Sequence, residues 1–412
     1  MRWTGALLVL LAVTAYAMAT GYSLLFRLSY VLGGVLVVAW VWSRLSIRGV
    51  EVELVEATRE TEVGGWAEER LRVRNNTRVP KTWVEVQDQT DLPGHRGGNV
   101  VGLPQHEFRS WRLRTRCLRR GVFNLGPFTV TSGDPFGLFR HSRATGVSHT
   151  LLVYPKTVPL PHFNLAPGEL AGEERLQRRA PQVTPNAATV REYLHGDSFN
   201  RVHWPTTARV GELMVKEFEL DSASNLWVVL DLQRDVHSGA PPENTEEYAV
   251  TVAASLARKY LDMNRSVGFI AYGQEAQVVK PERGAGQFQL ITRALAEAKA
   301  QGEIPLHAVL TREGQSFGLH SAVVVITPST LSDWGRLVGG LARRGVKAAA
   351  VVIDVNSFGR RDVTVPGVVA QLTGAGVAAY LVRQGENLSE ALRPVGLGEL
   401  EQPSPATLES RA

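Results

Sequence analysis

The chain has 412 residues, of which 44% are hydrophobic and 21% charged, so it is neither a disordered polar chain nor one wholly embedded in a membrane. Its 45 basic and 40 acidic side chains give a net charge of +5, too small for a dedicated nucleic-acid-binding protein. One cysteine excludes a disulfide framework and a zinc site built from thiolates. At roughly 150 residues per domain, the length predicts two or three domains.

The first 48 residues are predicted to form a hairpin of two transmembrane helices. Residues 4–26 carry no charge and are long enough, as a helix, to cross a bilayer core of ~30 Å. Beyond Arg27, residues 28–42 are again uncharged. The alternative is a secretory signal peptide with a cleavage site at Ala17, but a second apolar segment follows at once, which favours the hairpin.

The arginines around this hairpin predict its orientation. Arg2, Arg44 and Arg48 flank the two outer ends, whereas Arg27 alone lies in the tight loop. Because cytoplasmic segments carry the excess of positive charge, residues 49–412 are expected on the cytoplasmic side of the inner (cell) membrane. The lipid bilayer is therefore one expected partner.

Residues 49–150 are predicted to form an all-β, sandwich-like domain. Apolar and charged side chains alternate with a period of two along 50–54, 70–74 and 111–117, which is typical of strands with one buried face. Turn-rich stretches such as 75–77 and 93–98 separate these segments. Several short strands, each with one apolar face, favour a small sandwich.

Six arginines lie between Arg109 and Arg120, where no acidic residue occurs. They form either a cationic stripe for lipid headgroups or an acidic partner, or the solvated face of one strand paired with Glu51, Glu53 and their neighbours. The alternation along this segment favours the second interpretation and places Cys117 on the buried face.

Residues 151–224 are predicted to be a proline-rich connector that carries an unusually polar pattern over 190–219. One interpretation is acid–base catalysis, for instance by Asp197 with His203. We favour a charge-paired clasp in which Arg–carboxylate pairs fix the geometry above Tyr193 and Trp204, because no nucleophile, metal-ligand set or cofactor motif accompanies the pattern. The candidate signature and interaction residues are Arg191, Glu192, Tyr193, Gly196, Asp197, Arg201, Trp204, Arg209, Lys216 and Glu217.

This pattern resembles the signature of the domain of unknown function 58 family. The matching residues are Tyr154-Pro155, Arg191-Glu192-Tyr193, Gly196-Asp197, Arg201, Trp204, Ala208-Arg209, Leu213 and Val215-Lys216-Glu217, with Asp134-Pro135-Phe136-Gly137-Leu138 upstream. The resemblance implies a bacterial membrane protein with a von Willebrand factor A-like domain and no established activity. It also implies partners, since family relatives are usually encoded beside MoxR-type AAA+ ATPases and membrane-bound transglutaminase-like proteins.

The expected function is therefore that of a membrane-anchored protein-interaction module or adaptor that works with a MoxR-type AAA+ ATPase. The alternative is a membrane-proximal, hydrolase-like enzyme that uses the polar constellation of 191–219, although no catalytic residue is assigned. The sequence contains no phosphate-binding P-loop, dinucleotide-binding fingerprint or zinc-protease motif, so it does not itself hydrolyse ATP by a P-loop mechanism. No nucleic-acid partner is expected.

Residues 225–385 are predicted to form a doubly wound, Rossmann-like α/β domain. Helical patterns over 243–264, 287–300, 329–344 and 365–373 alternate with continuous apolar runs, which are typical of strands covered by helices on both faces. These runs occupy 225–231, 266–272, 321–327, 346–354 and 377–383. Residues 276–280 add a hairpin beside the second strand, as in a von Willebrand A-like fold.

The first strand of this domain ends at a degenerate metal site. The resembled modules place Asp-x-Ser-x-Ser there to hold a divalent cation, and this chain keeps Asp231 but has Gln233 and Asp235 in place of the serines. We therefore expect no bound cofactor, with Mg²⁺ held by Asp231 and Asp235 through water as the alternative. Residues 386–412, with five glutamates, are predicted to be an acidic, flexible tail.

Overall fold

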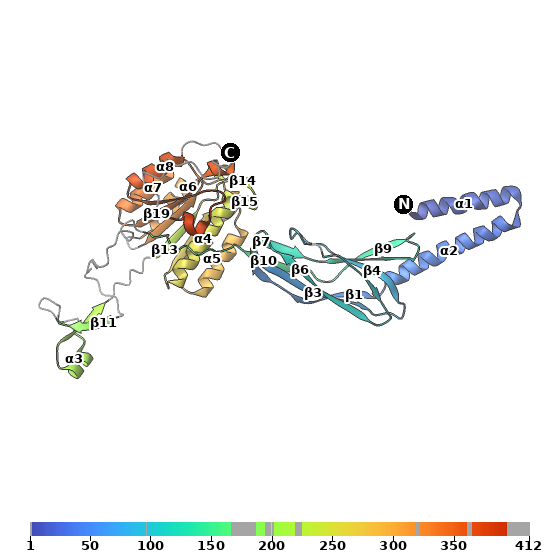
Figure 1. Cartoon of the computed structure of the whole chain (residues 1–412), viewed down its shortest axis with the longest axis horizontal. Coiled ribbons are helices and arrows are strands. Elements are labelled where there is room, and N and C mark those ends of the chain that lie inside the picture. Colours follow the sequence, from blue (N-terminus) through green and yellow to red (C-terminus); the bar gives the residue numbers. More distant parts are fainter. Residues whose placement is uncertain are drawn as a thin grey trace, which may run out of the picture. The chain divides into compact units, whose positions relative to one another are not determined.

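The computed structural model describes residues 2–95, 97–165, 187–193, 199, 202–218, 225–318, 321–360 and 365–393, with the backbone alone for Arg2, 187–191 and 216–218. The chain divides into two compact units (Figure 1). The first comprises Met1–Lys156 together with Thr292–Glu297, and the second comprises Thr157–Ile291 and Ala298–Ala412.

Two apolar helices begin the first unit, α1 (Arg2–Thr20) and α2 (Ser23–Ile47), and they contact each other. Gly21, with φ +69°, lies in the turn between them. Both helices are long and apolar enough to cross a membrane. Many of their apolar side chains face outward, among them Leu8, which is 65% exposed, and Tyr30, which is 75% exposed. The predicted pair of membrane-length helices is thus confirmed by length and composition.

Ten strands follow within residues 50–95 and 97–154. They are β1 (Val50–Ala57), β2 (Glu60–Glu62), β3 (Trp66–Asn75), β4 (Lys81–Asp88), β5 (Asn99–Leu103), β6 (Phe108–Arg116), β7 (Gly121–Leu125), β8 (Phe128–Gly133), β9 (Arg140–Thr145) and β10 (His149–Tyr154). They form sheets ordered β1-β3-β6, β2-β10-β7 and β5-β4-β8-β9. The predicted β-rich region is confirmed.

The core of this region lies between the sheet β1-β3-β6 and the sheet β5-β4-β8-β9. Val52 and Leu71 from the first sheet and Val86 and Phe128 from the second belong to one buried cluster. The period-two alternation of the sequence predicts this arrangement, because each strand turns one apolar face inward. Cys117 is buried, as its position on the inward face predicts.

The arginines of β6 face solvent, and their predicted cross-strand pairing needs one correction. The Nε atom of Arg114 lies 2.9 Å from the Oε1 atom of Glu68 on β3. Glu53 on β1 pairs instead with Arg72 on β3, at 3.7 Å. Because β3 lies between β1 and β6, the expected pairing of the β6 arginines with Glu51 and Glu53 is wrong, and β3 supplies their partner.

Lys81 joins α2 to the β-rich region. Its side chain is buried, and its Nζ atom donates a hydrogen bond to the carbonyl oxygen of Leu45 at 2.6 Å. Leu45 lies in the last turn of α2, where carbonyl groups lack partners within the helix, so the ammonium group satisfies one of them. Burial lowers the pKa of Lys81 below its ordinary value.

The second unit contains a mixed six-stranded sheet ordered β17-β16-β13-β18-β19-β20. Its strands are β13 (Leu226–Leu230), β16 (Val267–Tyr272), β17 (Ala276–Glu282), β18 (Ala322–Thr327), β19 (Lys347–Ile353) and β20 (Ala378–Val382). All neighbours pair in parallel except β17, which runs antiparallel to β16. The predicted strands and the predicted hairpin are therefore present.

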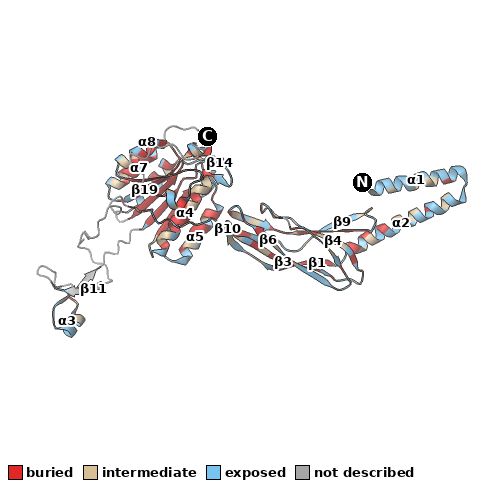
Figure 2. Cartoon of the chain, viewed as in Figure 1, coloured by how far each residue is buried: buried red, intermediate tan, exposed pale blue. Residues whose placement is uncertain are grey.

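Helices and short elements complete this unit. They are α4 (Thr245–Asp262), α5 (Ala285–Glu297), α6 (Leu306–Glu313), α7 (Ser332–Arg343), α8 (Val365–Gly374) and α9 (Leu388–Ala391), with the short strands β14 (Gly239–Ala240) and β15 (Glu243–Asn244). Val228 and Val229 point to opposite faces of β13 and both are 0% exposed, so both faces of the sheet are covered, as the buried strands of Figure 2 show.

Two helices differ from the sequence prediction. The helix α6 was not predicted, because eight residues with Leu306, Val309 and Leu310 buried give too short a pattern to stand out. The helix α9 and the buried Leu392 lie inside the segment expected to be a flexible tail. That expectation is wrong for residues 386–393, and residues 394–412 lie outside the described part of the chain.

Candidate functional site

The order of strands reverses between β13 and β18. From β13 the chain leads first to β16 and β17 on one side, and later to β18, β19 and β20 on the other. In open α/β sheets, ligands lie beyond the carboxyl ends of the strands at such a point. Asp231 directly follows β13 and Thr327 ends β18, so these two residues meet at the place where a site is expected.

The Asp231 carboxylate is buried and hydrogen-bonded within the protein. Its Oδ2 atom accepts a hydrogen bond from the Thr327 hydroxyl at 2.6 Å, and its Oδ1 atom accepts one from the Gln233 N–H at 3.1 Å. The Thr327 hydroxyl oxygen in turn accepts from the Ser329 N–H at 2.8 Å. Burial raises the pKa of Asp231, whereas the Thr327 hydrogen bond opposes that shift.

The backbone after Asp231 is held by a histidine. His237 Nε2 lies 2.9 Å from the Asp231 carbonyl oxygen, and its Nδ1 lies 3.0 Å from the Thr245 hydroxyl at the start of α4. Neither His237 nor Thr245 is among the sites predicted from the sequence. The signal for such a contact is a histidine seven positions after the end of β13, and it is too common to be specific.

Asp235, the second predicted metal ligand, lies on the short 3₁₀ turn Arg234–Val236 and is exposed. Its carbonyl oxygen accepts a hydrogen bond from the Arg360 guanidinium at 2.5 Å. Both carboxylate oxygens of Asp231 already accept a hydrogen bond from within the protein. The absence of a cofactor at this site stays a prediction.

The family signature folds into a small hairpin with one helix. Its strands β11 (Ala187–Glu192) and β12 (Met214–Phe218) pair antiparallel, and α3 (Trp204–Val210) lies between them in the chain. The His203 N–H donates to the Met214 carbonyl oxygen at 2.7 Å, and the Met214 N–H donates to the Thr207 hydroxyl at 3.0 Å. Gly211 ends the helix in the left-handed conformation, with φ 85°.

Large apolar side chains of this hairpin are exposed. Phe199 and Trp204 are each 63% exposed, Val210 is 56% exposed and Leu213 is 38% exposed. The ring of Tyr193 lies against that of Phe199, with centroids 5.6 Å apart. Trp204 does not pack beneath ion pairs as predicted, because it faces solvent at the start of α3.

The charged signature residues are described only in part. Glu192 and Arg209 are exposed, the latter in the last turn of α3. The side chains of Arg191, Lys216 and Glu217, and all of Gly196, Asp197 and Arg201, lie outside the described residues. The charge-paired clasp therefore stays a prediction.

Comparisons with known proteins support the family resemblance that the signature indicates. Residues 189–375 match a family described as "Protein of unknown function DUF58". The chain is also 27% identical, over 227 residues, to the "Uncharacterized protein YeaD" of Bacillus subtilis (strain 168), a match that covers 54% of each protein. The chain thus spans about half the length of this curated relative.

These features define a class of protein that combines two membrane-length helices, a β-rich region and a mixed α/β sheet. Residues 189–375 of this chain match the DUF58 family, as the signature predicts.

Solved structures give only slight likenesses. The CARDB domain of the PF1109 protein from Pyrococcus furiosus, in complex with di-metal ions, has a TM-score of 0.21 and 13% identity, covering 25% of this chain and 91% of that one. The β-glucosidase of Listeria innocua in complex with glucose has a TM-score of 0.18 and 10% identity, covering 25% of this chain and 16% of that one. Neither likeness carries an argument about function.

Proposed function

We propose that this protein is a membrane-anchored interaction module that binds a MoxR-type AAA+ ATPase on the cytoplasmic side of the membrane. The hairpin of β11, α3 and β12 forms the contact surface, and the α/β unit that follows it is a von Willebrand factor A-like domain. The ATPase as partner rests on the family resemblance.

The observation that carries the proposal is the exposure of the signature's apolar side chains. Tryptophan is strongly enriched among the residues that dominate binding energy at protein interfaces. Trp204 is 63% exposed within the family signature, and Phe199 and Val210 of the same hairpin are similarly exposed. The burial of such an apolar surface by a partner is favourable, because it removes apolar side chains from water.

The strand order supports the von Willebrand A-like assignment. Numbered from β13 to β20 in chain order, the sheet reads 3-2-1-4-5-6, with the third strand antiparallel at one edge. The Asp231 carboxylate lies at the reversal point of this order and accepts hydrogen bonds from within the protein. Internal hydrogen bonding suits a rigid scaffold for a binding surface better than a reacting group.

The two apolar helices support anchoring. α2 leads into β1 through Gly49, and Lys81 contacts the last turn of α2, so the β-rich region is attached directly to the helix end. The excess of arginines at the outer ends of the hairpin favours the cytoplasmic side for the two units.

A reconstitution experiment tests this function. The full chain is placed in lipid vesicles, the purified MoxR-type ATPase of the same organism is added, and the vesicles are sedimented. We expect the ATPase to sediment with vesicles that hold the protein and to stay in solution with empty vesicles. Equal sedimentation in both samples, or none in either, contradicts the proposal.

A further inference from the structure

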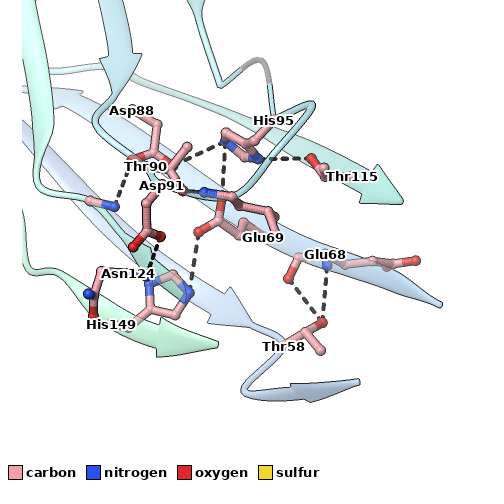
Figure 3. A network of polar contacts seen from close by, with 12 residues as sticks. Thr58, Glu68, Glu69, Asp88, Thr90, Asp91, His95, Thr115, Asn124 and His149 are labelled. Carbon is pink, nitrogen blue, oxygen red and sulfur yellow. Dashed lines mark hydrogen bonds and ion pairs between the residues drawn. The ribbon is translucent and has the colours of Figure 1, made fainter. Parts of the chain in front are cut away.

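A buried cluster of ionisable side chains lies in the β-rich region, far along the chain from the signature (Figure 3). Glu69 comes from β3, Asp88 ends β4, His95 lies in the following loop and His149 begins β10. The side chains of Glu69, Asp88 and His95 are 2%, 0% and 3% exposed, respectively. Burying two carboxylates is costly unless each has a partner of opposite charge.

The partners within the described residues are histidines that approach without forming hydrogen bonds. His95 Nε2 lies 3.1 Å from Asp88 Oδ2 and 3.9 Å from Glu69 Oε2. His149 Nε2 lies 3.3 Å from Glu69 Oε1. None of these atoms has a hydrogen-bond partner of suitable geometry among the described residues. The cluster therefore holds several buried oxygen and nitrogen atoms without hydrogen-bond partners among the described residues, and they lie close together.

Spacings of this size fit a shared metal ion. The ligand atoms of Glu69, Asp88 and His95 all lie within 4.8 Å of one another. Nitrogen and oxygen ligands bind Zn²⁺ at about 2.0–2.2 Å, so two neighbouring ligands of a tetrahedral ion are roughly 3.3–3.6 Å apart. The separations of 3.1 and 3.9 Å from His95 Nε2 bracket that value.

Neighbouring groups orient the ligands as they do around bound metals. Asp88 Oδ1 accepts a hydrogen bond from the Gly126 N–H at 2.7 Å, which leaves Oδ2 for the cluster. His95 Nδ1 lies 2.8 Å from the Thr115 hydroxyl, which leaves Nε2 for the cluster. Metal-binding histidines and carboxylates are typically fixed by such outer contacts.

The backbone also closes around the cluster at Gly97. A Cβ atom at this position would lie 2.4 Å from His95 Nε2 and 2.6 Å from the Asp88 Cβ. Any other residue here would displace the imidazole or the carboxylate. A glycine is therefore required for these two groups to keep their positions.

We propose that Glu69, Asp88 and His95 bind one divalent transition-metal ion, with Zn²⁺ as the ion of best fit, and that His149 is a positioning residue for Glu69. Two carboxylates and an imidazole suit Zn²⁺ and neighbouring ions such as Mn²⁺ and Co²⁺. The ion neutralises the two buried negative charges and ties β3, β4 and the following loop together. Three protein ligands leave the fourth position of a tetrahedral ion to water. Because all three side chains are buried, we assign the ion a role in stability.

Metal analysis of the full chain in detergent tests the site. The purified protein is stripped with a chelator, incubated with Zn²⁺ alone, desalted, and assayed for bound metal and for thermal unfolding. We expect one tightly held ion per chain and a higher melting temperature in the loaded form. A wild-type chain that retains no stoichiometric Zn²⁺ overturns the proposal.

Variants locate the ion. Asp88→Asn and His95→Ala should each weaken Zn²⁺ binding by more than about 100-fold, and His149→Ala by about 10- to 100-fold, the range for outer-contact residues. His106→Asn is the matched control, since His106 is an exposed histidine of the same unit whose positive φ of 56° asparagine tolerates. Asp231→Asn should also leave binding unchanged. Wild-type affinity in His95→Ala, or lost affinity in Asp231→Asn alone, contradicts this location.

A spectroscopic measurement covers the case in which ligand variants fail to fold. Co²⁺ added to the stripped wild-type chain should give visible absorption bands that Zn²⁺ then displaces, because both ions occupy the same nitrogen and oxygen ligands. The appearance of displaceable bands supports the site without any substitution, and their absence in the folded wild-type chain overturns it.

Discussion

The Thr327 hydroxyl donates a hydrogen bond of 2.6 Å to the Asp231 carboxylate and so links the ends of two central strands of the α/β sheet. Asp231 follows β13 and Thr327 ends β18, on either side of the point where the strand order reverses. Both residues are buried. This link gives the carboxylate a structural partner at the reversal of the strand order, where open α/β sheets bind ligands.

Removal of the donor should destabilise the α/β unit. Thr327→Val keeps the shape of the side chain but leaves a buried carboxylate oxygen without its partner, which typically costs about 1–3 kcal/mol of unfolding free energy. Thr327→Ser keeps the hydroxyl and serves as the control. Denaturant unfolding of the full chain in detergent measures both variants, and wild-type stability in Thr327→Val would show that the hydrogen bond contributes nothing.

Because of Lys81, the unfolding free energy of the protein should change with pH in the alkaline range. Its pKa is lower in the folded chain than the ordinary value of 10.5, because the ammonium group is buried. Below the folded pKa the native state bears the full cost of burying the charge. As the pH rises toward 10.5, the native state loses its proton before the unfolded state does, so this cost disappears.

The test compares the wild type with Lys81→Met, which keeps the apolar stem and cannot ionise. We expect the unfolding free energy of the wild type, relative to the variant, to increase between pH 7 and 10, by about 1.4 kcal/mol for each unit of pKa difference. A difference between the two proteins that does not change with pH argues against a buried charge at position 81.

The clasp predicted from the signature has its own test. If Asp197 and Arg201 pair in a partly buried setting, removing either one leaves an uncompensated charge, at a typical cost of ~3–5 kcal/mol. Asp197→Ala and Arg201→Ala should each lower the melting temperature by several degrees, and the double variant should fall little further. Unchanged melting in both single variants, together with loss of partner binding, would favour direct contact or catalysis over a clasp.

Membrane orientation is tested by a reporter. A reporter that is active only in the cytoplasm, fused after Ala412, should be active, because Arg2, Arg44 and Arg48 outnumber Arg27. A periplasmic reporter at the same position should be silent. The reverse pattern would place both units outside the cytoplasm and revive the signal-peptide interpretation.

The α/β sheet could be predicted because each of its central strands is a continuous apolar run. Along β18, Val323, Val324 and Val325 are all 0% exposed, so the sequence shows no alternation and indicates a strand buried on both faces. Short elements could not be predicted this way. The eight residues of α6 span little more than two turns, too few to establish a helical period.

The buried cluster has one signal in the sequence. Glu69 stands between Ala67 and Leu71 in the alternation of β3, on the inward face, where a charged side chain is unexpected. Its partners Asp88, His95 and His149 come from other strands and loops, so only the fold brings them together. Trp204 is a similar case, since neither its exposure nor its place at the start of a short helix follows from an irregular mixture of polar and aromatic residues.

The affinity of the full chain for the MoxR-type ATPase tests the central claim most directly. The protein is held in lipid nanodiscs on a sensor surface, and the association and dissociation rates of the ATPase give the affinity. The wild type, Trp204→Ala and Trp66→Ala are compared. Trp66 is the matched control, because it is 50% exposed on β3 of the other unit. We expect Trp204→Ala to weaken binding by about 30-fold, as loss of a central interface tryptophan typically costs at least ~2 kcal/mol, while Trp66→Ala binds like the wild type. Equal affinity of all three proteins, or no binding by the wild type, would contradict the account.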